Sequence, residues 1–299
     1  MPRPWAAILA GGEGRRLNSV TTGITGEPTP KQFCRLLGPM TMIDETRQRL
    51  AGVVDDRQTV LMLSKSHRRF YADLAQSRPP SLMVEQPASQ GTGAAMAFAL
   101  GRICRADRDA VVAFFPSDHY YSNVGAFRVA VAAAYRVASE QWDRLVLVGA
   151  TPHRAEPDYG WIEPSKPLGN ISASDNTAFG VNRFWEKPEM SVTTQLFQRQ
   201  CLWNTFITVG TIDAFRRAFL ATQPQLVGTM EAIEGASPSD EARVAESEYR
   251  RVPSVSFSQD VLALAPELLA VVPLRASGWV DIGRPERLAD VQRPVAIPA

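Results

Sequence analysis

The sequence contains few of the residues that build disulfide frameworks or histidine-based metal sites. Its 299 residues include only three cysteines and three histidines. Cys34, Cys104 and Cys201 are widely spaced, which is typical of reduced thiols in a cytoplasmic protein and not of a disulfide framework. The histidines show no metal-ligand spacing, so a surface or packing role is expected for each of them.

Excess charge and long apolar runs are also missing. The formal net charge is +1 at pH 7, which leaves no electrostatic indication of a nucleic-acid partner. No apolar run is long enough to cross a bilayer, so no membrane partner is expected. The apolar run after Arg3 is followed at once by glycines and Glu13, and we interpret it as a first strand rather than a signal peptide. Because the chain has no linker, repeat or low-complexity tract, residues 1–299 are expected to form one continuous domain.

Hydrophobic residues are plentiful, at 45% of the sequence, which is enough for a sizeable core. Strand-like and helix-like segments alternate in the first half. This rhythm predicts an α/β fold with a mostly parallel sheet that helices cover on both faces. The expected strands are residues 6–10, 59–64, 81–87, 110–118 and 144–150, and the expected helices are residues 42–50, 67–76, 93–104 and 126–140.

The second half is less regular. Residues 235–246 are acidic and rich in small side chains, which favours an exposed loop. A polar loop is expected to join the first two strands of this half. The expected strands are residues 159–164, 178–188, 204–211 and 268–274, and the expected helices are residues 191–201, 212–222 and 259–265.

The segment LAGGEGRRL, residues 9–17, comes directly after the first expected strand. Gly11, Gly12 and Gly14 can adopt positive φ angles, and their bare N–H groups can cradle an anion. Arg16 adds a forked donor for phosphate oxygens. The segment matches neither the P-loop nor the dinucleotide-binding fingerprint, since both fail at its Arg-Leu end. A phosphate loop and a plain glycine turn with solvated arginines therefore both remain open.

Three candidate segments fall at the ends of expected strands: residues 9–17, called the glycine loop below, Gln86-Pro87 and Pro116-Ser117-Asp118. In parallel sheets, ligands bind beyond the carboxyl ends of the strands. The three segments are therefore expected to meet at one edge of the sheet.

Across most of its length the sequence resembles the nucleotidyltransferases that make nucleotide sugars, and most closely the mannose-1-phosphate guanylyltransferases. The resemblance implies a single Rossmann-like (GT-A-like) domain with a mostly parallel mixed sheet. It also implies transfer of a nucleotidyl group from an NTP to a sugar 1-phosphate, with release of pyrophosphate. A nucleotide-binding half, about 1–150, would precede a sugar-phosphate-binding half, about 151–299. The motifs that carry the resemblance are GGEGRRL, PKQF (30–33), QPASQGT (86–92), FPSDHY (115–120), YGWIEP, FWEKP (184–188), LWNTF (202–206) and WVDIG (279–283).

The resemblance also implies roles for individual residues. Arg16 matches the loop arginine of the family and Lys31 the lysine of its PKQ motif, and both would hold the triphosphate. Asp118 and Asp281 match its metal ligands, with Mg²⁺ as the expected cofactor, since magnesium uses one or two carboxylates and completes its shell with phosphates. Arg16, Lys31 and Asp118 are the expected catalytic residues. The expected nucleotide-binding residues are Gly11, Gly12, Gly14, Arg16, Gln86, Gly91 and Thr92, and the expected sugar-phosphate-binding residues are Gly160, Glu186, Lys187 and Asn204.

Four segments depart from the family pattern. Residues 18–29 form a longer loop than usual. Ser258 and Gln259 stand where the family often has an Asp-Tyr pair, so no family role is carried over to Asp260. QPASQGT also fits thymidylyl- and uridylyltransferases, so GTP is the expected donor with UTP and dTTP open. WNTF lacks the glycine of the common Trp-Asn-Ser-Gly, so mannose 1-phosphate is the expected acceptor with glucose and heptose phosphates open.

Three further points stay open at this stage. A non-catalytic subunit that senses nucleotide sugars is the alternative of another class. A homodimer is one open oligomeric state. The sequence ends soon after Asp281, so no isomerase domain or hexapeptide-repeat helix is expected after the catalytic domain.

Overall fold

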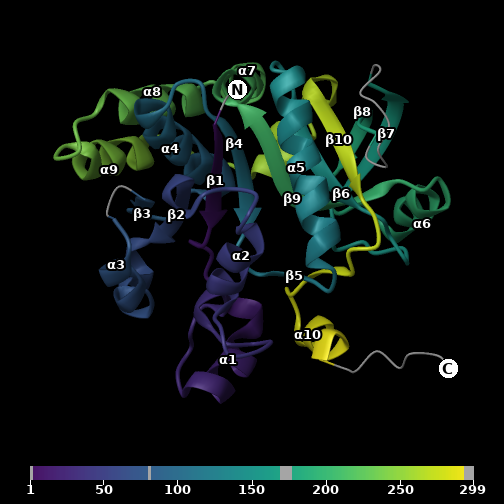
Figure 1. Cartoon of the computed structure of the whole chain (residues 1–299), viewed down its shortest axis with the longest axis horizontal. Coiled ribbons are helices and arrows are strands. Elements are labelled where there is room, and N and C mark those ends of the chain that lie inside the picture. Colours follow the sequence, from purple (N-terminus) through teal and green to yellow (C-terminus); the bar gives the residue numbers. More distant parts are fainter. Residues whose placement is uncertain (1–2, 80–81, 169–176, 293–299) are drawn as a thin grey trace.

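A computed structural model describes residues 3–79, 82–168 and 177–292. In these residues nine strands form one sheet in the order β3-β2-β1-β4-β9-β6-β10-β8-β7, and β5 pairs with β11 as a separate ribbon (Figure 1). Only β8 and β9 run against the other strands of the large sheet. The strands are β1 (Pro4–Leu9), β2 (Thr59–Ser64), β3 (Met83–Gln86), β4 (Val111–Pro116), β5 (His119–Tyr121), β6 (Leu145–Ala150), β7 (Trp161–Pro167), β8 (Phe179–Trp185), β9 (Leu202–Thr211), β10 (Leu269–Leu274) and β11 (Trp279–Asp281).

Helices cover both faces of this sheet (Figure 1). Several begin where a side chain caps the first turn: Asn123 accepts from the Ala126 N–H at α5, and Thr211 from the Ala214 N–H at α7. The helices are α1 (Asn18–Thr25), α2 (Met42–Leu50), α3 (Ala72–Ser77), α4 (Gly91–Ala106), α5 (Val124–Glu140), α6 (Met190–Gln198), α7 (Ile212–Thr222), α8 (Gln225–Gly235), α9 (Glu241–Arg251) and α10 (Pro285–Gln292).

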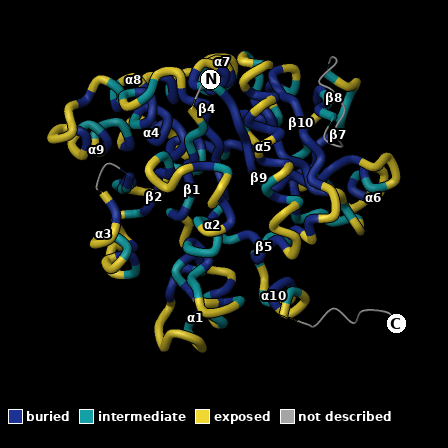
Figure 2. The backbone as a smooth tube through the Cα atoms, in the orientation of Figure 1, coloured by how far each residue is buried: buried dark blue, intermediate teal, exposed yellow. Residues whose placement is uncertain are grey.

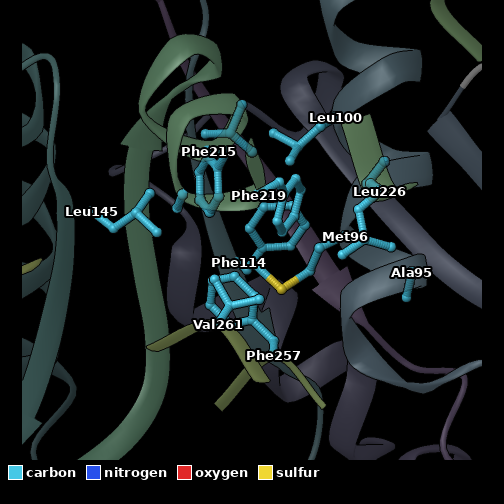
Figure 3. Close-up of a cluster of buried hydrophobic side chains, with 14 of the residues drawn as sticks. Ala95, Met96, Leu100, Phe114, Leu145, Phe215, Phe219, Leu226, Phe257 and Val261 are labelled. Carbon is cyan, nitrogen blue, oxygen red and sulfur yellow. The ribbon is translucent and has the colours of Figure 1, made fainter. Parts of the chain in front are cut away.

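Alternate residues of each strand enter two separate hydrophobic cores, as the two-residue period of a strand requires. In β1, Ala7 faces the core made with α4, α7 and α8, while Ala6 and Ile8 face the core made with α5. Figure 3 shows the first core, where the Phe114 ring of β4 meets the edge of Phe215 from α7. The strands between the two cores are buried along most of their length (Figure 2). The expected α/β fold with a mostly parallel mixed sheet is confirmed.

Three expectations about local structure are wrong. The expected loop at 18–29 consists largely of α1. The expected loop at 235–246 contains the end of α8 and the start of α9, because Glu241 is buried and forms ion pairs with Arg102 and Arg105 of α4. Those partners lie too far away in the sequence for local composition to reveal them.

The expected helix at 67–76 is broken into a 3₁₀ segment, Lys65–Phe70, and the short α3. The break falls at Tyr71, which is buried and whose hydroxyl hydrogen-bonds to the Ser64 carbonyl and to Glu85. The expected polar loop between β7 and β8 lies partly outside the described residues. Within the described part of the chain, no helix has both the length and the apolar character needed to cross a membrane.

Candidate functional site

A pocket of about 290 Å³ opens at the carboxyl ends of β1, β2, β3 and β4. The three segments that were expected to converge all line it, which confirms that expectation. Eight of the predicted site residues line this pocket: Gly11, Gly12, Gly14, Lys31, Gln86, Gly91, Thr92 and Asp118. Arg16, Asp281 and the four predicted sugar-side residues do not line it.

The glycine loop is shaped by contacts as much as by backbone freedom. Of its three glycines, only Gly14 has a positive φ, at 62°. Gly11 differs, because a Cβ there would lie 2.6 Å from Nε2 of Gln86 and would have to displace that side chain. Gln32, which the sequence analysis did not single out, donates from Nε2 to the carbonyls of Ala10 and Gly12, both at 2.8 Å. Gln32 therefore holds the loop in place from the PKQF motif.

The two arginines of the loop differ in their surroundings. Arg15 is exposed and pairs with Glu13 in solvent. Arg16 is also exposed, yet it lies close enough to lower the pKa of Lys31, although this is the smallest of the contributions to that pKa. Arg16 is therefore at the rim of the pocket, where a ligand phosphate could meet it.

Lys31 lies between the two predicted metal-ligand carboxylates. Its Nζ is 2.7 Å from Oδ2 of Asp118 and 3.9 Å from Oδ1 of Asp281, and it donates to the Ile282 carbonyl at 2.8 Å. Burial lowers the pKa of Lys31, but the two carboxylates outweigh it and the pKa is raised. Burial likewise raises the pKa of Asp118, but Lys31 outweighs burial and the pKa is held below its ordinary value. Lys31 and Asp118 therefore form an ion pair at neutral pH.

His119 faces the same carboxylates, and a hydrogen bond from Trp279 holds the opposite side of its ring. Its Nδ1 accepts the indole N–H of Trp279 at 3.1 Å, which places the imidazole proton on Nε2. That nitrogen lies 3.9 Å from Oδ1 of Asp118 and 3.7 Å from Oδ1 of Asp281. Burial lowers the pKa of His119, in keeping with a neutral ring. The pairing of β5 with β11 sets Asp281 opposite His119 and so brings this C-terminal segment to the site.

Arg287 of α10 is a further site residue that the sequence analysis missed. Its guanidinium lies 3.5 Å from Oδ2 of Asp281 and donates to Asp158 at 3.1 Å. It also stacks over the Tyr159 ring at 4.3 Å, and its side chain is 7% exposed. Arg287 thus ties Asp281 to the turn before β7. No local sequence signal distinguishes it from the other arginines.

The four predicted sugar-side residues gather beside the pocket. The Asn204 N–H donates to the Gly160 carbonyl at 2.8 Å, and a Cβ on Gly160 would lie 3.1 Å from Oε2 of Glu186. Lys187 is 56% exposed and pairs with Oε1 of Glu186 at 2.8 Å. The structure therefore brings these four residues together, with Lys187 toward solvent.

A bulge in β9 connects this group to the pocket. In the pairing of β6 with β9, Leu147 lies opposite Thr208 but Gly149 lies opposite Asn204, so β9 carries extra residues here. Phe206 sits in this bulge with a φ of 66° and lines the pocket. Its N–H donates to the Asn204 side chain at 3.0 Å.

The bulge explains why the family pattern has a glycine at this position. Phe206 occupies the position of the glycine in Trp-Asn-Ser-Gly, and the structure requires a positive φ there. Glycine adopts such an angle without strain, whereas phenylalanine does not. The missing glycine in WNTF was the available signal, although it did not reveal that an aromatic ring would line the pocket.

A closely packed glycine forms the other wall. Gly91 has a φ of 76°, and a Cβ there would lie only 2.2 Å from the Val255 carbonyl oxygen. The neighbouring Gly93 N–H donates to that oxygen at 2.9 Å, and the Val255 N–H donates to the Gln90 carbonyl at 3.1 Å. The residues around Val255 therefore back the segment that leads into α4.

We expect Gly91→Ala to lower the free energy of unfolding by about 2–4 kcal/mol, because the methyl group meets backbone and the φ angle is unfavourable for alanine. Urea unfolding measures this loss. Gly228→Ala in α8 is the matched control, since nothing lies within 4 Å of its added Cβ and alanine favours a helix interior. Wild-type stability of Gly91→Ala would contradict the close approach described here.

Comparison with known proteins places this geometry in a family. Residues 5–296 match the family described as nucleotidyl transferase. The xanthan biosynthesis protein XanB of Xanthomonas campestris pv. campestris (strain B100) is 29% identical over 289 residues, covering 95% of this chain and 58% of that protein. Mannose-1-phosphate guanylyltransferase ManC of Salmonella typhimurium is 29% identical over 289 residues, covering 93% of this chain and 57% of that protein.

A solved structure supports the same fold. The structure titled mannose-1-phosphate geranyltransferase from Thermus thermophilus superimposes with a TM-score of 0.78 at 24% identity, covering 94% of this chain and 76% of that chain. The present chain spans 58% and 57% of the length of the two curated relatives above. Because the family match extends over almost all of its residues, the chain belongs to the nucleotidyl transferase family.

Proposed function

We propose that this protein transfers a nucleotidyl group from an NTP to a hexose 1-phosphate and releases pyrophosphate, with GTP and mannose 1-phosphate as the substrates. The observation that carries the proposal is the placement of Lys31, Asp118 and Asp281 at the mouth of the glycine-loop pocket. This arrangement suits a reaction in which catalysis is mainly positioning and neutralisation of phosphate charge. The names of the curated relatives support the choice of guanine and mannose.

The nucleotide half of the proposal rests on the pocket itself. Gly11, Gly12 and Gly14 bring bare backbone to the triphosphate, and Arg16 adds a cation at the rim. Lys31 has a protonated ammonium 12% exposed to solvent, and it would bind phosphate oxygens at the reacting centre.

The donor set fits magnesium. Asp118 and Asp281 supply hard carboxylate oxygens, and no group of three or more His, Cys, Asp or Glu side chains among the described residues is arranged to hold a metal ion by itself. A metal at these two aspartates would therefore draw its remaining ligands from phosphates and water, as Mg²⁺ does in nucleotide sites. Bound there, it would neutralise charge on the triphosphate. His119 and Arg287 hold the two carboxylates in place.

The sugar half rests on the group beside the pocket. Glu186 and Asn204 would accept and donate hydrogen bonds to sugar hydroxyls, and the Gly160 backbone lies against both. Lys187 is free to turn from Glu186 toward a phosphate, because it is exposed and its present ion pair is a surface one. The division of the chain into a nucleotide half and a sugar half remains part of this proposal.

We expect Lys187→Ala to reduce kcat/KM for the sugar phosphate by about 10- to 100-fold, since one charge-assisted hydrogen bond is worth roughly 1.5–3 kcal/mol. Nucleotide affinity in the absence of sugar should stay at the wild-type value. Arg16→Ala should show the reverse, with nucleotide affinity reduced first. Calorimetric titration with nucleotide alone, followed by kinetics at varied sugar phosphate, separates the two variants.

Lys166→Ala is the matched control for Lys187, because Lys166 is an exposed lysine at the end of β7. Lys166→Ala should change neither kcat/KM for the sugar phosphate nor the affinity for nucleotide. If Lys187→Ala lost nucleotide affinity as severely as Arg16→Ala, the division of labour between the two cations would be wrong.

The proposed function is tested by a matrix of substrates. GTP, UTP, dTTP, ATP and CTP are each combined with mannose, glucose and heptose 1-phosphates in the presence of Mg²⁺, and pyrophosphate release is measured. The highest kcat/KM is expected for GTP with mannose 1-phosphate. A clear preference for UTP or dTTP would overturn the choice of base, and binding without turnover for every pair would favour a nucleotide-sugar-sensing subunit.

A further inference from the structure

A buried pair of polar side chains closes one end of the pocket. The Tyr249 hydroxyl donates to Oε1 of Gln86 at 3.2 Å. Gln86 is 6% exposed and Tyr249 is 2% exposed. Burial raises the pKa of Tyr249 far above its ordinary value, so the phenol keeps its proton and remains a donor. The hydrogen bond therefore determines which end of the Gln86 amide faces Tyr249.

The other end of the amide, Nε2, donates no hydrogen bond within the described part of the chain, although Gln86 lines the pocket. Nε2 lies against Gly11, where even a Cβ would come within 2.6 Å of it. An amide whose oxygen is engaged can offer a ligand only its N–H donors. Gln86 thus presents a donor at the pocket wall.

Tyr249 is itself firmly held. Its ring meets the Phe98 ring of α4 edge-on at 6.1 Å. Its carbonyl accepts from Nε2 of Gln90 at 3.0 Å, directly beside the segment that contains Gly91. Tyr249 belongs to the last turn of α9, whose first residues lie in the segment that was expected to be a loop. Rotation of the Gln86 amide would therefore cost this hydrogen bond, since the tyrosine cannot follow it.

We propose that Tyr249 is a positioning residue that holds Gln86 with its amide donors in the pocket, and so selects nucleotides whose base presents a carbonyl oxygen at that edge. Guanine and uracil have such an oxygen, while adenine and cytosine present an amino group in its place. An amino group would meet another donor and leave both unpaired, which is costly in a buried site. The inference rests on the proposed use of an NTP, but it concerns base selection alone.

The test compares Tyr249→Phe with wild type. Kd is measured by calorimetry for GTP against ATP and for UTP against CTP, without sugar phosphate, and kcat/KM is measured for the same pairs with mannose 1-phosphate. Loss of the hydroxyl frees the amide to rotate. The preference for GTP over ATP and for UTP over CTP, as a ratio of Kd or of kcat/KM, should therefore fall about three- to tenfold. A packing defect alone would weaken all four nucleotides equally and leave both ratios unchanged, and that result would overturn the proposal.

Tyr135→Phe is the matched control, because it also removes one buried hydroxyl, which donates to the Trp5 carbonyl at 2.7 Å in a part of the protein that does not line the pocket. It should lose stability without a change in either ratio. Gln86→Glu removes the donor itself, so it should lower the preference for carbonyl bases further than Tyr249→Phe does. Unchanged ratios in Gln86→Glu would show that Gln86 does not read the base and would also overturn the inference.

The two readouts keep this inference distinct from the proposed function. Absence of turnover with every nucleotide would contradict the proposed reaction, while the Kd ratios would still decide the role of Tyr249. Normal turnover with unchanged ratios in Tyr249→Phe would leave the reaction intact and exclude the positioning role.

Discussion

Replacement of Asp118 or Asp281 by asparagine is expected to lower kcat/KM by about a thousandfold. Asparagine preserves the shape of the side chain but removes its charge, so the site loses a hard anionic ligand for the metal and with it the placement of the triphosphate. Both carboxylates lie next to Lys31 and His119, and each would supply a separate ligand to the metal. The effect should therefore be large for each substitution alone.

Pyrophosphate release is measured for both variants over a range of Mg²⁺ concentrations, with thermal melting as a check of folding. The variants should also need more metal to reach their residual rate, whereas a purely structural defect would leave the metal dependence unchanged. Asp213→Asn in α7 is the matched control, since Asp213 is an exposed aspartate paired with Arg216 and does not line the pocket. Near-normal turnover of either site variant would exclude that residue from the metal site.

Lys31→Met is expected to reduce kcat/KM by about 100- to 1,000-fold and also to destabilise the protein. The substitution removes the ammonium between two carboxylates, so Asp118 keeps a partly buried charge without its 2.7 Å partner. Loss of one partner of such a pair costs about 1–3 kcal/mol in the free energy of unfolding. Activity falls for a different reason, since the cation that would bind the phosphates is missing.

A double variant separates the two effects. Lys31→Met combined with Asp118→Asn removes both charges, so urea unfolding should show a higher stability than for Lys31→Met alone. Its activity should be no higher than that of either single variant. If the double variant were as unstable as the sum of the two single changes, the ion pair would contribute nothing and Lys31 would have to act through its contact with the Ile282 carbonyl.

The fold and the nucleotide end of the site were predictable because both depend on local patterns. Buried strands that break into turns produced the correct sheet class, and the rule that ligands bind beyond strand ends brought the glycine loop, Gln86 and Asp118 to one pocket. Asp281 was identified by resemblance only, and its placement opposite His119 depends on the pairing of β11 with β5. The roles of these residues remain predictions.

The parts that were not predictable depend on contacts between distant segments. Residues 235–246 are polar, and only the burial of Glu241 between Arg102 and Arg105 explains why α9 forms there. Without α9 the sequence analysis could not place Tyr249 beside Gln86. Arg287 and Gln32 were missed for the same reason, since each acts through partners that sequence spacing does not show.

The bulge in β9 brings one side chain, that of Phe206, to the pocket wall. Strand pairing continues on both sides of the bulge, with Asn204 opposite Gly149 and Thr208 opposite Leu147. Of the three residues between them, Thr205 and Ile207 are buried, and Phe206 lines the pocket. Under the proposed function, the side chain at Phe206 would set how much room the two substrates share. Engineering a wider acceptor range would start at this one position, where glycine would also relieve the backbone.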